Sequence, residues 1–276
     1  MQGPLFRIIF PLFVLTMWVT LGTWIVQDDW SGLNWLMLGT AALCCAIVFA
    51  DFTSIFNYGY ALTMTLLPLE VLILRDLSTA SLLVGVIVIL FGLRLLAFTQ
   101  RRRTAESFAG GRAAARAVND NVPTPVRVML FVFVTTLMTF TGIPVYLVAV
   151  DGETTPWVVA GAVLMAVGLL YEAVADEQKQ SAKAKNPGTF VRTGLWARTR
   201  HPNYAGEIVF QVGLGICALG AVSEWWQFVG AVVAPAYIVV LMCFSAKSGT
   251  ARMAGRYGSD PEFQDYLGRS RSLLPI

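Results

Sequence analysis

The chain carries little charge for its length of 276 residues, because Asp, Glu, Lys and Arg make up only 13% of it. Soluble globular domains carry about 25%. With 56% apolar residues, too little polar surface remains to cover a water-soluble globule, and coiled coils and disordered chains are excluded as well. The apolar residues lie in long blocks without the alternation typical of membrane β-strands. The sequence therefore predicts an all-α, polytopic membrane protein.

Cysteine and histidine are also scarce, with four and one residue respectively. Cys44, Cys45, Cys217 and Cys243 all fall within apolar blocks, and none has metal-site spacing with His201. This excludes a disulfide-rich extracellular scaffold and argues against a zinc site. We expect the cysteines to be buried hydrophobic residues, and we expect no metal and no nucleic acid as partners.

Eight blocks are long and apolar enough to cross a bilayer as helices, which takes about 20 residues. They are 5–26, 33–50, 55–74, 80–98, 128–150, 157–175, 205–222 and 226–246. The block 55–74 also holds Asn57, Pro68 and Glu70, so that seven spans are the alternative. We treat 1–276 as a single membrane-embedded domain, with N-terminal helices in 1–127 and a C-terminal part in 128–276.

The distribution of charge predicts the orientation of the spans. Seventeen of the 20 Lys and Arg residues lie in the connections 99–127 and 176–204 and in the tail 247–276. Basic residues collect on the cytoplasmic side of membrane proteins. Eight spans with both termini in the cytoplasm place all three segments on that side. Within the first connection, 104–118 is rich in Ala, Gly and Arg, which favours a helix on the membrane surface over a flexible loop.

Ionisable residues within the spans are costly and indicate possible functional sites. They are Glu70, Arg94, Glu172 and Glu207. Arg94 could alternatively extend its side chain to the interface.

The segment 171–207 concentrates polar residues at helical spacing. Glu172, Asp176, Lys179 and Lys183 share one helix face, which could also be an ordinary solvated face. Asn203 and Glu207 are four residues apart at the start of the next helix, after Arg198, Arg200 and His201. A helix N-terminus close to cations suits an anion such as phosphate. The alternative is an interfacial belt of Trp, Tyr and Arg.

These residues resemble the C-terminal signature of the steroid 5-alpha-reductase family, and its bacterial branch most of all. The motifs that carry the resemblance are Glu172-x-x-x-Asp176-x-Gln178-Lys179, Gly194-Leu195-Trp196, Arg200-His201-Pro202-Asn203-Tyr204-x-Gly206-Glu207, Arg256-Tyr257-Gly258, Asp260-Pro261-Glu262-Phe263 and Leu274-Pro275. The resemblance is specific over 157–276 and weak over 1–127.

The resemblance implies an integral membrane enzyme that uses NADPH to reduce a carbon–carbon double bond conjugated to a carbonyl. It places the cofactor among the C-terminal helices and cytoplasmic loops of a bacterial inner-membrane protein. The residues that it assigns to the cofactor are Glu172, Asp176, Lys179, Lys183, Arg192, Trp196, Arg200, His201, Asn203, Tyr204, Glu207, Arg252, Arg256 and Tyr257. Lys183, Arg192, Arg200 and His201 would face the phosphates. We expect His201 to donate a hydrogen bond there, or to hold the loop on the helix, and not to act as a general acid.

The sequence departs from the family in two places. The tail reads Ser248-Gly249-Thr250-Ala251-Arg252, where relatives often carry a glutamate. The Gln-Glu pair and the Tyr that polarise a steroid ketone have no clear counterpart in the N-terminal helices. Asn57 and the candidate catalytic residues Tyr58, Tyr60 and Glu70 are the nearest polar side chains.

Two other functions remain open at this point. The isoprenylcysteine-type carboxyl methyltransferases share the Arg-His-Pro-x-Tyr segment but bind S-adenosylmethionine. A non-catalytic binding protein of the same fold is the other. In each case the expected partners are membrane lipids and an apolar, steroid-like or isoprenoid-like molecule that enters from the lipid phase.

Overall fold

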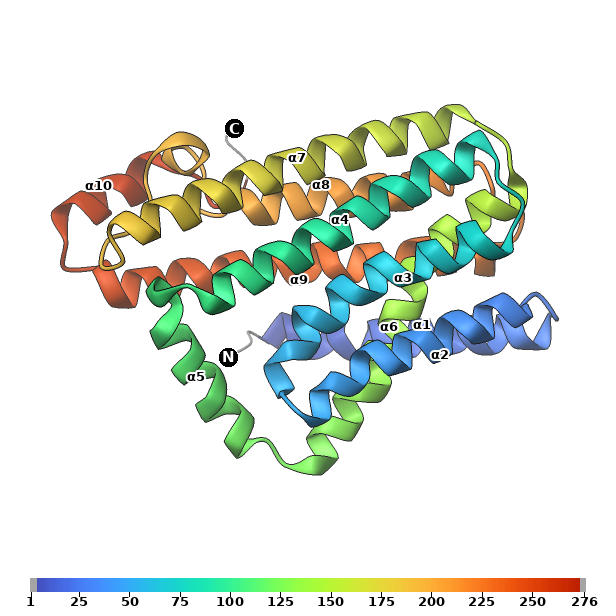
Figure 1. Cartoon of the computed structure of the whole chain (residues 1–276), viewed down its shortest axis with the longest axis horizontal. Helices are drawn as coiled ribbons and strands as arrows, with labels where there is room; N and C mark the ends of the chain where they lie inside the picture. Colours follow the sequence, from blue (N-terminus) through green and yellow to red (C-terminus); the bar gives the residue numbers. More distant parts are fainter. Residues whose placement is uncertain (1–3, 274–276) are drawn as a thin grey trace.

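The computed structural model describes residues 4–273, and that part of the chain folds as helices (Figure 1). Within it, extended pairing is limited to one parallel bridge between Thr199 and Arg271. The family motif Leu274-Pro275 lies outside the described residues.

Each of the eight predicted blocks contains an α-helix that spans most of it. These helices are α1 (Pro4–Val26), α2 (Gly32–Cys45), α3 (Tyr58–Leu74), α4 (Thr79–Thr104), α6 (Thr124–Asp151), α7 (Pro156–Lys185), α8 (Pro202–Cys217) and α9 (Trp225–Tyr257). Six helical segments are long and apolar enough to cross a membrane, and α3 is a shorter apolar helix. The chain is a polytopic helical membrane protein, and the doubtful block 55–74 contains a helix.

The helix ends differ from the predicted blocks in a regular way. The helices α4, α7 and α9 continue well past residues 98, 175 and 246, because their polar ends form helix outside the apolar stretch. Apolarity therefore marks the membrane-embedded part of each helix and not its full length. By contrast, α8 ends at Cys217, five residues before the predicted end, and a turn follows over 218–220.

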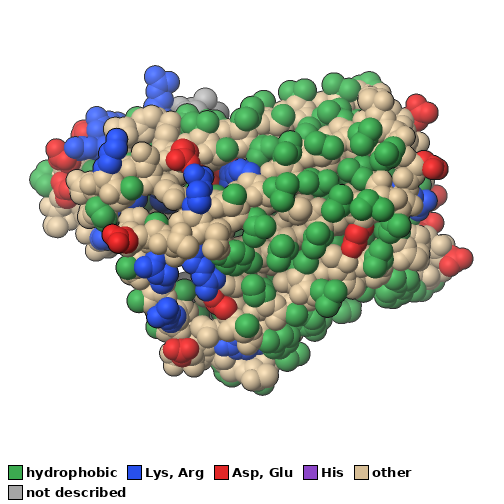
Figure 2. All heavy atoms as spheres, in the orientation of Figure 1, with side chains coloured by type: hydrophobic (Ala, Val, Ile, Leu, Met, Phe, Trp, Pro, Cys, Tyr) green, Lys and Arg blue, Asp and Glu red, His purple; other side chains and the backbone are tan. Residues whose placement is uncertain are grey.

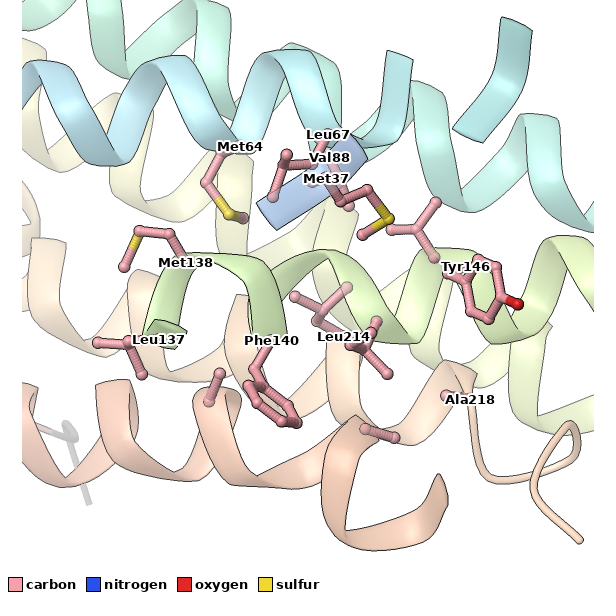
Figure 3. Packing of buried hydrophobic residues seen from close by; sticks show 14 of the residues in the cluster. Met37, Met64, Leu67, Val88, Leu137, Met138, Phe140, Tyr146, Leu214 and Ala218 are labelled. Atoms are coloured by element: carbon pink, nitrogen blue, oxygen red, sulfur yellow. The ribbon is translucent and has the colours of Figure 1, made fainter. Parts of the chain in front are cut away.

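The helix α6 forms the centre of the bundle. Its residues from Phe133 to Ala149 are buried without interruption. Helices α1, α2, α3, α4, α8 and α9 all pack against it. Figure 3 shows Met37, Met64 and Leu67 on one side of α6 and Leu214 on the other. Side chains from both halves of the chain thus share one core.

The helices α7 and α8 approach each other unusually closely. Each carries two glycines seven residues apart, Gly161 and Gly168 on α7 and Gly206 and Gly213 on α8. A Cβ atom at Gly168 would lie 2.5 Å from the backbone nitrogen of Phe210, and one at Gly206 would lie 2.7 Å from that of Glu172. Small residues allow close backbone contact between membrane helices. The glycines therefore bring the polar turns of α7 and α8 side by side.

The connection between α4 and α6 contains α5 (Ala109–Asn121), preceded by the 3-10 helix Glu106–Phe108. A helix is present in the region 104–118, as predicted, and its main part is shifted towards the C-terminus. Figure 1 shows α5 running across the ends of the neighbouring spans. None of its residues is buried.

A tenth helix, α10 (Pro261–Arg269), closes the tail and was not predicted. Phe263 and Tyr266 of α10 pack on Phe190 from the connection after α7. This small apolar cluster lies beyond the spans and joins the tail to the connection 186–201.

The surface divides along the long axis. Figure 2 shows Lys and Arg, interspersed with Asp and Glu, gathered at the end that carries α10, apolar side chains over the middle, and mainly Asp and Glu at the opposite end. The three segments that hold most of the Lys and Arg residues thus lie at one end of the bundle, as the predicted orientation requires.

The contact between α7 and α8 predicts which glycines the fold requires. Gly168→Ala places a methyl group against backbone atoms that cannot move aside, so we expect a loss of about 1–3 kcal/mol in the free energy of unfolding. Gly39 has no atom within 4 Å of an added Cβ, so Gly39→Ala serves as the control. Thermal unfolding in detergent measures both variants. An equal effect of the two substitutions would contradict the close contact.

Candidate functional site

A buried ion cluster joins α4 to α7. The two guanidinium nitrogens of Arg94 lie 2.8 Å from a carboxylate oxygen of Glu172 and 3.0 Å from one of Asp176. Only 5% of Glu172 and 4% of Asp176 is exposed. Arg94 therefore turns inward and does not extend to the interface, because it compensates the charge of two nearly buried carboxylates.

A second buried cluster joins α3 to α8. Tyr60 donates its hydroxyl hydrogen to Glu207 at 2.6 Å, and the side-chain amide of Gln211 donates to the Tyr60 oxygen at 2.7 Å and to Glu207 at 3.2 Å. Glu207 and Gln211 are four residues apart on α8 and both are buried. Two carboxylates, Glu172 and Glu207, thus lie on adjoining turns of α7 and α8.

Two aromatic rings connect the clusters. Phe91 of α4 stacks on Phe210 of α8 with ring centroids 4.0 Å apart. The Arg94 guanidinium lies 5.8 Å from the centre of the Phe91 ring, and the Tyr60 ring lies 6.2 Å from it. The polar groups consequently rest on an apolar floor formed by these two rings.

Two adjoining cavities open at the basic end above these clusters. The first, the Asn203 cavity, has a volume of about 570 Å³ and is bordered by α4, α7 and the start of α5. The second, the His201 cavity, has about 430 Å³ and lies between α7, α9 and the connection 190–201. Lys179, Lys183 and Arg256 line both cavities.

The linings carry a strong excess of positive charge. One carboxylate, Asp176, faces six cations, which are Arg102, Lys179, Lys183, Arg200, Arg252 and Arg256. The side chain of Asn203 lies beside Asp176, and its amide oxygen is buried without a hydrogen-bond partner among the described residues. The side-chain amide oxygen of Gln180 is likewise buried without a hydrogen-bond partner among the described residues. An anionic ligand with hydrogen-bond donors matches such a lining.

His201 is held against α9. Its ring nitrogen Nε2 lies 2.9 Å from the Thr250 hydroxyl oxygen, and its ring stacks on Tyr204 at 5.3 Å. A Cβ atom at Gly249 would lie 2.7 Å from the His201 ring, so a glycine is needed there for this contact. Of the two roles expected for His201, these contacts correspond to holding the loop on a helix.

Trp196 and Lys179 form the wall between α7 and the connection 190–201. The Trp196 indole nitrogen donates to the Ala175 carbonyl at 2.9 Å, and the Lys179 ammonium lies 4.8 Å from the centre of the ring. Tyr266 of α10 donates to the Trp196 carbonyl at 2.7 Å. Gly194, at φ 60°, lets the Leu195 amide reach the side chain of Gln178.

Three of the basic residues expected near phosphates have protein partners. The Arg200 guanidinium donates to the Ser270 hydroxyl at 3.0 Å and to backbone carbonyls of the same segment. Arg192 pairs with Glu262 at 2.7 Å. Lys183 donates to the carbonyls of Pro187 and Thr189 while it still lines both cavities.

The structure brings most of the expected cofactor residues together. Eleven of the 14 line the cavities, whereas Glu172 and Glu207 lie one turn below Asp176 and Asn203, and Arg192 lies outside. Of the three candidate catalytic residues, Tyr60 alone reaches this site. Tyr58 donates to Gln100 in an exposed position, and Glu70 bonds Thr40 further along α3.

Sequence analysis missed several residues of the site. Gln211 follows Glu207 by four residues, and that spacing was available as a signal. Arg102 and Phe98 come from the end of α4, where no pattern in the sequence indicated a contact with α7. The helix α10 had a signal in Asp260-Pro261, because Asp260 caps the helix and proline takes its first position.

The environment of His201 predicts a specific pH dependence. Burial, followed by the positive charges of Lys179, Arg200 and Arg252, lowers the pKa of His201 to about 4. In the unfolded chain the imidazole of His201 takes up a proton near pH 6.5, whereas in the folded protein it stays neutral until about pH 4. Because the unfolded state binds the proton more tightly, the free energy of unfolding falls as the pH is lowered from about 6.5 to about 4. We expect His201→Gln to remove about 2 kcal/mol of the stability loss between pH 7 and pH 4. Thermal unfolding of both proteins across this range measures it, and parallel profiles would contradict the lowered pKa.

Comparison with known proteins identifies the family. A family model described as "Protein of unknown function (DUF1295)" matches residues 51–270, which include every element of the site. No curated protein and no solved structure matches the chain. The chain belongs to the DUF1295 family, which is part of the steroid 5-alpha-reductase-like superfamily.

Proposed function

We propose that the protein is a membrane-embedded, NADPH-dependent reductase that acts on a carbon–carbon double bond conjugated to a carbonyl. The observation that carries the proposal is that the cation-lined cavities lie one helical turn from the buried Tyr60–Glu207–Gln211 cluster, since Asn203 lines a cavity and Glu207 follows it by four residues on α8. A bacterial inner membrane is the proposed location. The proposed substrate is an apolar, steroid-like or isoprenoid-like enone that enters from the lipid phase.

The residues of the two cavities fit NADPH. Its three phosphate groups require several cations, and Lys179, Lys183, Arg252 and Arg256 line the cavities in addition to Arg102 and Arg200. The unpartnered amide oxygen of Asn203 suits a donor of the cofactor, such as a carboxamide or ribose hydroxyl. Trp196, His201 and Tyr204 offer flat ring faces in the His201 cavity.

When bound, NADPH would supply a hydride to the β-carbon of the enone, and the reduction would be completed by a proton from water that adds to the α-carbon. The role of the chain is then to orient the two reactants and to polarise the carbonyl oxygen. Tyr60 is suited to the second task. Its hydroxyl hydrogen points at Glu207, and Gln211 fixes the hydroxyl oxygen from the other side. Turning that hydrogen towards a substrate carbonyl would make Tyr60 the electrophilic donor, with the Phe91 and Phe210 rings beneath it.

The charge of the cavities also bears on the alternative methyltransferase. S-adenosylmethionine carries no phosphate and has a positive sulfonium, so six cations against one carboxylate disfavour it. Three phosphates are favoured by the same lining. We therefore retain the reductase as the single proposal, and a non-catalytic binding protein becomes an outcome of the experiments.

The first test concerns the cofactor. We expect the purified protein in detergent to bind NADPH and not S-adenosylmethionine. Asn203→Ala should weaken NADPH binding about 5- to 150-fold, because a buried polar partner is worth about 1–3 kcal/mol. Asn121→Ala, at the exposed end of α5, is the matched control. Equal NADPH affinity of the two variants would remove Asn203 from the site, and binding of S-adenosylmethionine alone would refute the reductase.

The second test concerns Tyr60. With progesterone as an enone probe, we expect Tyr60→Phe to lower turnover about 10²- to 10³-fold, the usual effect of removing such a donor. NADPH binding should persist, since the ring remains. Tyr58→Phe removes a hydroxyl two residues away that bonds only Gln100, and it should leave turnover unchanged. If the two variants have the same turnover, Tyr60 does not have the proposed role.

A further inference from the structure

A third cavity lies on the other side of α4 and plays no part in the proposed reduction. It has a volume of about 480 Å³ and is enclosed by the end of α4, by α5 and by the 3-10 helix Phe52–Phe56. We name it the Arg116 cavity. Four arginines line it, namely Arg102, Arg103, Arg112 and Arg116.

Three of these arginines have no acidic partner. Arg103 pairs with Asp51 at 2.8 Å. Arg112 donates to the backbone carbonyls of Arg103 and Ala105, which carry no net charge. Across residues 4–273, no carboxylate lies within ion-pair distance of Arg102, Arg112 or Arg116. The cavity therefore holds a surplus of guanidinium groups, which bind phosphate oxygens with matching geometry.

A buried hydroxyl group faces the same cavity. Thr99 lines it, is only 3% exposed, and its hydroxyl oxygen has no hydrogen-bond partner. Buried polar groups are normally paired. An oxygen-rich ligand in the cavity would accept the hydrogen bond that Thr99 does not make within the chain.

The cavity lies where the apolar surface of the spans begins. Phe49 and Phe56 are about half exposed next to its lining residues Ala50 and Ser54. On the other side, Val126 and Met129 start the exposed apolar surface of α6 directly after α5. Figure 1 shows α5 crossing the ends of the spans at this level. A lipid headgroup in the adjoining leaflet lies at the same depth.

We propose that the Arg116 cavity binds a phosphate group, and that the headgroup of an anionic membrane lipid supplies it. Arg112 and Arg116 are four residues apart on α5 and present their charges on one face. Basic pockets between transmembrane helices at the cytoplasmic side are suited to anionic headgroups. The lipid would fasten α5 to α4 and to the 3-10 helix without entering the Asn203 cavity.

The wall between the two cavities is formed by one stack of side chains. The Arg102 guanidinium lies 5.4 Å from the centre of the Phe98 ring and 5.1 Å from that of Phe108. Arg102 and Phe108 line both cavities, whereas Arg112 and Arg116 line only the Arg116 cavity. Substitution of Arg116 therefore tests the lipid site separately from the proposed cofactor site.

The experiment measures lipid binding to the full chain in detergent. Short-chain phosphatidylglycerol is titrated by native mass spectrometry, with phosphatidylcholine and inorganic phosphate as separate arms. We expect phosphatidylglycerol to bind, Arg116→Gln to weaken it about tenfold, and Thr99→Val to weaken it as well. The control Arg198→Gln removes an exposed arginine elsewhere at the basic end, and it should bind phosphatidylglycerol as tightly as the unchanged protein does. NADPH affinity should be the same in all of these proteins.

Four results would overturn the proposal. If Arg116→Gln and Arg198→Gln weaken phosphatidylglycerol binding equally, the lipid is attracted by the overall surface charge and not by the Arg116 cavity. Binding of phosphatidylcholine as tight as that of phosphatidylglycerol would remove the preference for an anionic lipid. Displacement of the lipid by an equal concentration of inorganic phosphate would indicate a soluble ligand. Loss of NADPH binding in Arg116→Gln with unchanged lipid binding would assign the cavity to the cofactor.

Discussion

The close contact between α7 and α8 is the constraint on which the rest of the site depends. Side chains larger than hydrogen at Gly168 or Gly206 would push the two backbones apart. Because the helices touch, Glu172 and Glu207 come to lie on adjoining turns, within reach of α3 and α4. Arg94 and Tyr60 then supply the partners that buried carboxylates need. Loss of the glycine contact would leave these groups without a common site.

Charge is arranged in two layers along the axis of the bundle. The deeper layer holds Glu172 and Asp176 against Arg94, and Glu207 against Tyr60 and Gln211, beside the stacked rings of Phe91 and Phe210. The upper layer holds six cations around the cavities. Removing one partner from a buried pair is costly, since the other charge stays in a medium of low polarity. The deeper layer is therefore fixed in place, whereas the upper layer keeps cations available for a ligand.

The tail of the chain supports the upper layer from outside the membrane. Tyr266 and Arg200 link α10 and the segment after it to the connection 190–201, which forms one wall of the His201 cavity. Gly249 lets α9 approach His201 from the other side. The tail sequence Ser248-Gly249-Thr250, which departs from the family pattern, thus provides the contacts that His201 makes with α9.

Local patterns in the sequence predicted the helices and half of the site. Apolar blocks located every span, because burial in lipid acts on each segment separately. Four-residue spacing correctly placed Glu172 and Asp176 on one face of α7, where both reach Arg94. The same spacing places Asn203 and Glu207 on one face of α8. Partners from other helices could not be predicted in this way, since Tyr60 and Glu207 are 147 residues apart. Tyr58 and Tyr60 differ by about 200° around α3, so only one of them can face α8, and no pattern indicated which. The repeated glycines of α7 and α8 were the signal for this contact.

Energy transfer from Trp196 to bound cofactor tests the central claim most directly. Trp196 lines the His201 cavity, so excitation of tryptophan should produce emission from the reduced nicotinamide when NADPH is bound. We expect this emission in the unchanged protein, its strong reduction in Trp196→Phe, and no displacement of NADPH by S-adenosylmethionine. Direct excitation of the nicotinamide confirms that the variant still binds. Sensitised emission that is the same in Trp196→Phe, or that S-adenosylmethionine abolishes, would contradict a nucleotide site above the Tyr60–Glu207 cluster.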